Sequence, residues 1–419
     1  MYSVIFYKNK ISDLIFSFPC TYKSISLAAI LLPIPILLLS RICKRIPQLS
    51  NSNSYSNEIR YVFPQLVIKQ DLPYNTSVHI IRGLYQDFSI YSPEYIGNAT
   101  TADLFALAFA TIYYATYENV ICRTDLSFYS NNSIYMQNVN CRTRFYNYSS
   151  KEHPYIDIKY NSYDNVICIG HQHSSDFGHW MIETFPLMWY IPKSVLNQSV
   201  IAIPRISQFV VDCLSILGVK KSSIIYGDDL YFHAKKLHTV TAPYCDYISY
   251  QAILNHRKNI VNSLSLDKVK PSRLVFFNRK RGMSRYLANI EMLIEEASRK
   301  YTNSTFELGI FYDRIVDQIK YFNEIKLLMA VHGSLMANLI FMQPETYVIE
   351  IQMEHIFFCF LRTAIFTGKK VTVVRDQSIS YRSIQDNMVN ISMAMSALDI
   401  VMKNMLGTNT FKRINFDDD

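Results

Sequence analysis

Short apolar runs alternate with helix-like segments between residues 165 and 375. The sequences NVICI at residues 165–169, RLVFF at 273–277 and LLMAV at 327–331 have the length and composition of strands buried on both faces of a parallel sheet. A helix-like segment follows each run. This alternation predicts an α/β fold with parallel sheets.

Polar residues collect directly after these runs, where open α/β sheets bind their ligands. The segment after NVICI, residues 170–189, holds three His, one Asp and one Glu. His179 and Glu183 lie four residues apart, so a helix would place both side chains on one face. Together with Asp176, they form a candidate catalytic block.

The corner after LLMAV reads His332-Gly333-Ser334. Gly333 permits a sharp turn into a helix that we expect to begin near Ser334, and the free N–H groups at that helix end would attract an anion. The next apolar run closes on Glu350. Most corners of this kind only reverse the chain, so this block does not identify a site by itself.

The loop after RLVFF is basic. It contains Arg279, Lys280, Arg281 and Arg285 before a helix that we expect from about Leu287. Four cations in one strand-to-helix loop suit a diphosphate. The alternative is an ordinary solvated surface loop.

Together, the three blocks resemble glycosyltransferase family 61 over roughly residues 165–374. The first block has the spacing His179-Trp180-x-x-Glu183-x-x-Pro186, the second contains Arg279, Arg285 and Asn289, and the third runs from His332 to Glu350. The chain departs from the family in one place. Leu335 and Met336 follow Ser334, where the family usually has a second Gly.

The resemblance implies an inverting transferase that uses a nucleotide-sugar, taken to be a UDP-sugar, and needs no bound metal or other cofactor. The sugar would be N-acetylglucosamine, xylose or arabinose, moved to a glycan or glycoprotein. The donor-binding residues would be Arg279, Lys280, Arg285, His332, Gly333, Ser334, Asn338 and Glu350. Asp176, His179 and Glu183 compete for the role of general base, and we favour His179 supported by Glu183.

Strand–helix alternation on both sides of residues 249–269 predicts two Rossmann-like halves. The resemblance adds a GT-B-like arrangement, in which the two domains face a cleft. Residues 61–250 would form the acceptor-side domain and 270–375 the nucleotide-sugar-binding domain, with a hinge at 249–269. Residues 102–117 predict a helix in the first domain. Residues 380–419 would form a C-terminal helix and tail, the helix at 388–405 crossing back to the first domain.

Other interpretations use the same residues. A zinc-dependent hydrolase could be built on His171, His173, His179 and Glu183, although the block lacks the His-Glu-x-x-His spacing. A non-catalytic, membrane-tethered sugar-binding relative is the second alternative. His179 could also be a hydrogen-bonded core histidine, and Glu350 a buried carboxylate paired with an arginine.

Residues 24–40 carry no charge and are long enough for a short membrane span. No small-residue cleavage site follows, which favours a retained anchor between a cytoplasmic tail at 1–23 and a stem at 41–60. Glycosylation sequons all come after the anchor, at Asn75, Asn98, Asn131, Asn147, Asn197, Asn303 and Asn390. They predict a single-pass type II protein of the Golgi or endoplasmic reticulum membrane, with its catalytic part in the lumen.

Length and composition agree with an enzyme of this kind. A chain of 419 residues with 49% hydrophobic residues is large enough for two cores. The net charge of +8 is spread along the chain, with no long basic stripe, so nucleic acid is not an expected partner. In an oxidising lumen, Cys122 and Cys141 are the best candidates for a disulfide.

Overall fold

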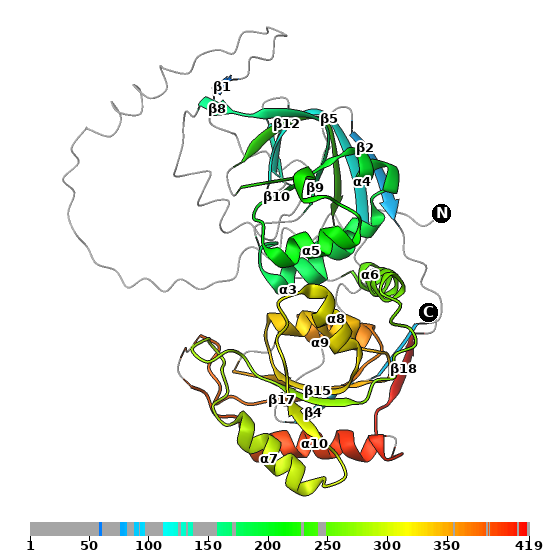
Figure 1. Ribbon diagram of the computed structural model, residues 1–419, viewed down its shortest axis with the longest axis vertical. Helices are drawn as coiled ribbons and strands as arrows, with labels where there is room; N and C mark the ends of the chain where they lie inside the picture. Colours follow the sequence, from blue (N-terminus) through cyan, green and yellow to red (C-terminus); the bar gives the residue numbers. More distant parts are fainter. Residues whose placement is uncertain are drawn as a thin grey trace, which may run out of the picture. The chain divides into compact units, whose positions relative to one another are not determined.

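The computed structural model describes the C-terminal two thirds of the chain almost without a break (Figure 1). The described residues are 58–60, 76–81, 88–91, 93–96, 112–124, 127–130, 133–136, 157–169, 173–227, 230–241, 249–354, 357–382, 384, 386–408 and 410–416. The expected tail, anchor and most of the stem lie outside these ranges. Among the helices described, none has both the length and the apolar character needed to span a bilayer.

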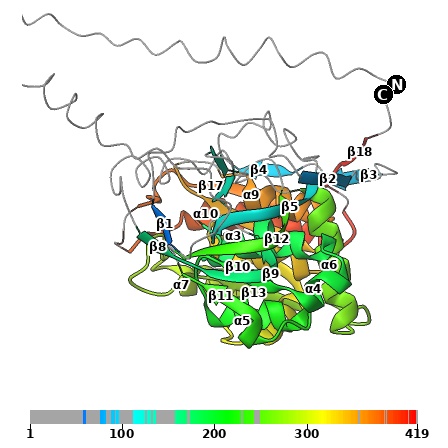
Figure 2. The same cartoon turned by 90° about the horizontal axis from the view of Figure 1, so that it is seen from above.

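The first sheet is mixed. Its parallel part has the order β11-β10-β9-β12, formed by β9 (Asn161–Cys168), β10 (Val200–Ile203), β11 (Ile224–Tyr226) and β12 (Tyr231–Thr241). Figure 2, seen from above, shows these strands lying side by side. Because the chain runs outward from β9 to β11 and then returns to β12 on the other side, the strand order reverses between β9 and β12.

Antiparallel strands extend the first sheet beyond β12. These are β5 (Ile112–Arg123), β2 (Thr76–Ile81), β6 (Ser127–Ser130) and β7 (Ser133–Met136). Two small ladders complete the strands, β1 (Glu58–Arg60) with β8 (Asp157–Lys159) and β3 (Phe88–Tyr91) with β18 (Arg413–Phe416).

The second sheet is entirely parallel. Its order is β14-β13-β15-β16-β17-β4, from β13 (Arg273–Phe277), β14 (Phe306–Leu308), β15 (Ile325–Val331), β16 (Tyr347–Gln352), β17 (Lys370–Arg375) and β4 (Glu94–Ile96). Here the strand order reverses between β13 and β15. The expected α/β fold with parallel sheets is confirmed.

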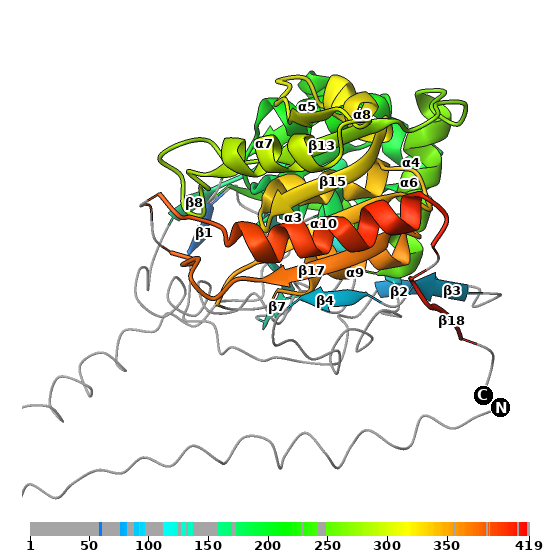
Figure 3. The ribbon, with the colours of Figure 1, turned by 90° about the horizontal axis from the view of Figure 1, so that it is seen from below.

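Helices cover both faces of the second sheet. α7 (Ile290–Lys300) and α10 (Ile391–Met405) pack on one face, and α8 (Ile315–Asn323) and α9 (Cys359–Phe366) on the other (Figures 1 and 3). The first sheet carries α4 (Lys193–Gln198), α5 (Gln208–Ile216) and the short 3-10 turn η4 (Lys221–Ser223). Gly218 ends α5 with φ +84°, as its place after the helix requires.

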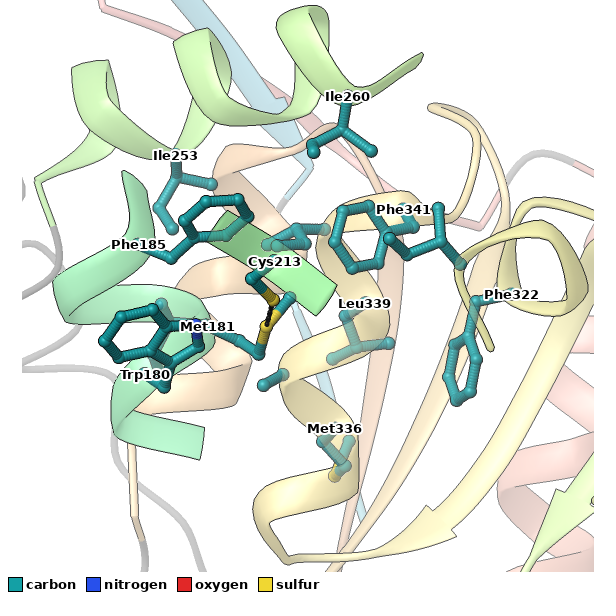
Figure 4. Packing of buried hydrophobic residues seen from close by; sticks show 14 of the residues in the cluster. Trp180, Met181, Phe185, Cys213, Ile253, Ile260, Phe322, Met336, Leu339 and Phe341 are labelled. Atoms are coloured by element: carbon teal, nitrogen blue, oxygen red, sulfur yellow. Dashed lines mark hydrogen bonds between the residues drawn. The ribbon is translucent and has the colours of Figure 1, made fainter. Parts of the chain in front are cut away.

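One apolar cluster contains residues from the elements around the first sheet and from those around the second sheet (Figure 4). We call these two parts of the protein its first and second halves. Helix α6 (Tyr250–Ser263) contributes Ile253 and Ile260 to this cluster and occupies most of the segment in which we expect the hinge. On α6, the buried His256 ring contacts Phe185 at 4.7 Å and Phe341 at 5.8 Å between ring centroids. Nε1–H of Trp189 donates to Nδ1 of His256 at 2.8 Å. His256 is therefore a core residue that joins the two halves.

The helix predicted over residues 102–117 is wrong from residue 112 onward, where strand β5 begins. Residues 102–111 lie outside the described ranges. The segment IYYATY at 112–117 consists mainly of aromatic and β-branched residues, which fit a pleated sheet. Ladders with β12 on one side and β2 on the other decide its conformation.

The crossing of the C-terminal helix to the first half is also wrong. Helix α10 begins at Ile391, and its apolar side packs with α7 over the second sheet. The side chain of Asn390 caps this helix by accepting from the N–H of Met393 at 3.1 Å. Burial of Leu398 and Val401 in the second sheet's own core explains why the helix stays there.

Only one cysteine of the expected disulfide lies among the described residues. Cys122 is fully buried in β5, and its Sγ lies 3.2 Å from the carbonyl oxygen of Arg123. Cys141 lies outside the described residues, so this pairing stays a prediction.

Candidate active site

The basic loop follows β13, at the point where the strand order of the second sheet reverses. Asn278 closes this loop, because its Oδ1 accepts from the N–H groups of Arg279 at 2.9 Å and Leu287 at 3.0 Å. Its Nδ2 donates to the carbonyl oxygen of Leu287 at 2.7 Å. Since Leu287 is held in this way, α7 begins at Ile290, three residues later than the pattern predicts.

Two of the four loop cations turn inward, toward the His332 corner. A Cβ added at Gly333 would lie 2.4 Å from Nη1 of Arg279, so only glycine lets that guanidinium lie against the backbone. Nη1 of Arg285 donates to the carbonyl oxygen of His332 at 3.1 Å. Both arginines are half-buried.

These two arginines have no anionic partner among the described residues. Neither forms an ion pair there, and each Nε is buried without a hydrogen-bond partner. Burial, reinforced by the charge of Arg285, lowers the pKa of Arg279 to about 10. Burial also lowers the pKa of Arg285. Two adjacent, partly desolvated cations of this kind favour an anionic ligand.

The other two loop cations point to solvent. Lys280 is exposed, with its Nζ 5.8 Å from the centroid of the Phe311 ring. Arg281 is exposed as well and forms a 3.5 Å ion pair with Asp386. The structure thus brings Arg279 and Arg285 to the corner and leaves Lys280 at its rim.

His332 and Glu350 form a buried pair. Nδ1 of His332 lies 2.7 Å from Oε1 of Glu350, and the two residues are 5% and 0% exposed. Because a carboxylate oxygen only accepts, Nδ1 is the donor. The partner of Glu350 is this histidine rather than an arginine. Burial, with a smaller effect of the Glu350 charge, raises the pKa of the nearby Tyr95 to about 12.

The corner continues into the short 3-10 helix η5 (Ser334–Phe341). The helix begins at Ser334, as expected, and Ser334 is exposed. Asn338 is fully buried, and its Nδ2 donates to the carbonyl oxygen of Leu335 at 2.9 Å. This hydrogen bond stabilises η5 from its buried side. Met336, part of the departure from the family pattern, is buried in the core (Figure 4).

The first block follows β9, where the strand order of the first sheet reverses. It consists of one turn of α-helix, α3 (Phe177–His179), a π-helical turn η2 (Trp180–Thr184) and the 3-10 helix η3 (Phe185–Tyr190). Nδ1 of His179 lies 3.0 Å from both carboxylate oxygens of Glu183, which confirms that the two side chains share a face. Asp176 is exposed at the start of α3.

Other residues of this block serve the core. Trp180 (Figure 4) and Pro186 are buried, and the Trp180 ring stacks on Phe185 with centroids 6.1 Å apart. The rings of His173 and His179 stack with centroids 5.1 Å apart. Within the described ranges no three His, Cys, Asp or Glu side chains are grouped as metal ligands would be, and His171 lies outside those ranges.

The His179 block and the His332 corner meet at Gly178. A Cβ added there would lie 3.4 Å from both Cα and Cβ of Ser334 and 3.5 Å from Cζ of Phe360. The residue next to His179 therefore touches the residue that begins η5. This contact places the His179–Glu183 pair beside the corner that holds Arg279 and Arg285.

Several residues of the site carry no clear sequence signal. Tyr381 and Phe357 reach the corner from segments after β16, and Asn278 acts only through the loop that it ties down. Asn289, which the second block does include, acts through its hydrogen bond to the carbonyl oxygen of Val389. Asn278 directly follows a buried strand, so its position was the one available clue. The aromatic pair could not be distinguished from the chain's many core aromatics.

Comparison with known proteins agrees with the geometry. Residues 177–349 match the family model described as Glycosyltransferase 61, a stretch that spans the His179 block, the basic loop and the His332 corner. A search among curated proteins found no match. Residues 177–349 therefore match a glycosyltransferase family 61 domain, and this match supports a glycosyltransferase enzyme.

Proposed function

We propose that the chain is an inverting transferase that moves N-acetylglucosamine, xylose or arabinose from a UDP-sugar to a glycan or glycoprotein. One observation carries this proposal above the others. Arg279 and Arg285 form an inward-facing pair without an anionic partner among the described residues, at the carboxyl ends of β13 and β15. Open α/β sheets bind nucleotides at this kind of position.

The donor diphosphate would lie between these arginines and the His332-Gly333-Ser334 corner. Charge-assisted hydrogen bonds from both guanidinium groups would hold it, and they would stabilise the negative charge that builds up as the diphosphate leaves. Lys280 would act from the rim. His332, held by Glu350, would contribute a ring nitrogen to the donor, while Asn338 would act through the backbone of η5.

The chemical step needs a base opposite the leaving group. In an inverting transfer, the acceptor oxygen attacks the anomeric carbon, the bond to the diphosphate oxygen breaks, and its electron pair stays on the diphosphate. A base must take the proton of the acceptor hydroxyl. His179 is our candidate, since Glu183 orients its ring through Nδ1 and an imidazole exchanges protons near neutral pH. Asp176, which is exposed, is the alternative.

The two-sheet organisation supports a GT-B-like arrangement, with the acceptor bound by the first half and the donor by the second. Each parallel sheet has one reversal of strand order, β9/β12 in the first and β13/β15 in the second. The His179 block follows β9 and the basic loop follows β13, so each begins at such a reversal. In this proposal, residues 61–250 and 270–375 supply the two sides of the site, although β4 of the earlier segment pairs with β17.

We also place the catalytic part in the lumen of the Golgi or endoplasmic reticulum, tethered by residues 24–40. The support comes from the sequons, because glycans are bulky and need an exposed asparagine. Asn197, Asn303 and Asn390 are all exposed. The other four sequons lie outside the described residues.

The experiment that tests the proposal is a turnover assay of the full-length protein in detergent against a panel of UDP-sugars. Release of UDP from at least one donor is expected, and Arg279→Ala should weaken UDP binding about 10-fold, the loss expected for a charge-assisted hydrogen bond. Arg281→Ala, in the same loop but paired with Asp386, is the matched control.

Three outcomes would contradict the proposal. Binding of a UDP-sugar without any release of UDP would indicate a non-catalytic sugar-binding relative. Loss of turnover with a chelator, restored by manganese, would show that the two arginines do not replace a metal. Stoichiometric zinc in the purified protein would instead support the hydrolase alternative.

A further inference from the structure

Tyr381 lies outside the segment that matches the family model, but it contacts the proposed donor site. The Cζ atom of Arg285 is 4.6 Å from the centroid of the Tyr381 ring, within the range of a cation–π interaction. Phe357 stacks on Tyr381, with centroids 4.8 Å apart and 29° between the planes. Phe357 also stacks on His332, with centroids 4.9 Å apart and 20° between the planes.

These contacts form a closed circuit. Arg285 lies over Tyr381, Tyr381 stacks on Phe357, and Phe357 stacks on His332. The circuit closes because Nη1 of Arg285 donates to the backbone carbonyl of His332 at 3.1 Å. The guanidinium is thus held at two points before any ligand is present. A group that is ordered in advance loses less conformational entropy when it binds an anion.

The backbone at Arg285 shows that the surroundings impose this position. Its φ is +67°, in the left-handed region that a residue with a long side chain rarely adopts. A conformation of this cost persists only where neighbouring contacts hold it. The loop is held next to it, since the N–H of Asn387 donates to the carbonyl oxygen of Tyr286 at 2.9 Å.

The segment that carries Tyr381 is itself anchored to the second sheet. The N–H of Asn390 donates to Oδ2 of Asp376 at 2.7 Å, and Nδ2 of Asn289 donates to the carbonyl oxygen of Val389 at 2.8 Å. The N–H of Tyr381 donates to Oε1 of Glu354 at 3.3 Å. Residues 376–382 and 386–390 therefore lie along the basic loop, and we call them the strap.

We propose that Tyr381 is a positioning residue for a nucleoside diphosphate. The face of its ring holds the guanidinium of Arg285 toward the corner, so the donor site extends beyond Glu350 to Tyr381 in the strap. This inference rests on the proposed function, because Arg285 must meet the donor diphosphate. It adds a requirement for an aromatic ring at residue 381.

The test measures nucleotide affinity by calorimetry on the full-length protein in detergent. UDP and GDP are both titrated into the wild type, and the one that binds more tightly is the probe. Tyr381→Ala should weaken its binding about 10-fold, whereas Tyr381→Phe, which keeps the ring face, should stay within about 2-fold of wild type. Tyr226→Ala, an exposed tyrosine at the end of β11, is the matched control and should bind as wild type does.

A double-mutant cycle separates positioning from general damage to the fold. If Tyr381 acts through Arg285, adding Tyr381→Ala to Arg285→Ala should weaken binding no further. Should Tyr381→Ala fail to fold, Tyr381→Leu fills the space without a ring face and is expected to weaken binding about 10-fold as well.

The outcomes distinguish the inference from the function on which it rests. The inference alone would be overturned by wild-type affinity in Tyr381→Leu or Tyr381→Ala. It would also be overturned if Tyr381→Ala lowered nucleotide affinity by the same factor in the wild type and in Arg285→Ala. If neither UDP nor GDP binds the wild type, or if Arg285→Ala binds as the wild type does, the proposed diphosphate site is itself wrong.

Discussion

Gly178 packs directly against Ser334, so that a Cβ added to the glycine would lie 3.4 Å from both Cα and Cβ of the serine. Gly178 precedes His179, the proposed base, and Ser334 follows the corner of the proposed donor site. The distance between the two halves of the site is therefore set by a residue without a side chain.

Substitutions at Gly178 should separate spacing from folding. Alanine should be tolerated, since 3.4 Å is close to an ordinary contact, and turnover should stay within about 3-fold of wild type. Leucine cannot fit there and should lower turnover at least about 10-fold, with UDP affinity little changed, because displacement of a reacting group is costly. Equal turnover in the two variants would show that this contact does not set the reaction geometry.

Kinetics of His179→Ala test the assignment of the base. Turnover should fall about 100-fold or more while UDP affinity stays within about 2-fold, as expected for a group that acts mainly in proton transfer. Asp176→Asn, at the exposed start of α3, is the paired variant and should retain most activity. If Asp176→Asn is inactive while His179→Ala keeps near-normal turnover, the base is Asp176 and His179 has a structural role.

Glu350 is expected to contribute to stability as well as to the site. Glu350→Ala leaves the buried Nδ1–H of His332 without its acceptor and opens a cavity, so the free energy of unfolding should fall by about 2–4 kcal/mol. Urea denaturation measures this loss. Glu295→Ala, on the exposed side of α7, is the control and should change stability by less than about 0.5 kcal/mol. A loss as small as that of the control would mean that the buried pair contributes little.

Local patterns predicted much of the second sheet and its site. The runs RLVFF and LLMAV became β13 and β15, because a strand buried on both faces needs an uninterrupted apolar sequence. The spacing of His179 and Glu183 also held, although their contact spans the junction between an α-helical and a π-helical turn. In each case the signal lies within a few neighbouring residues.

Long-range contacts decided what the sequence did not reveal. Residues 112–117 form a strand because β2 and β12 pair with them from distant parts of the chain. Tyr381 reaches Arg285 from 96 positions further along, so no local periodicity records their contact. Glu350 shows the same limit, since an arginine was one expected partner and His332 is the partner found.

Glycan analysis tests the lumenal placement. Because Asn197 and Asn303 are exposed, protein expressed in a eukaryotic secretory pathway should lose mass on treatment with an N-glycosidase. Asn197→Gln and Asn303→Gln should each reduce the mass shift by one glycan. Protein that shows no shift, measured by mass spectrometry, would contradict the placement of the catalytic part in the lumen.

The last prediction concerns acid stability and uses His256, at the junction of the two halves. Burial lowers the pKa of His256 from 6.5 to about 3. Between these values the unfolded chain binds a proton that the folded protein does not, so stability present above pH 6.5 is lost as the pH falls. From pH 7 to pH 5 this loss of stability amounts to about 2 kcal/mol.

His256→Gln removes the titrating group while leaving an oxygen that can accept from Nε1–H of Trp189. Over this pH interval, its free energy of unfolding should therefore fall by about 2 kcal/mol less than that of the wild type, measured by urea denaturation. Equal losses in the two proteins would show that His256 does not resist protonation in the folded state, and that the junction is open to water.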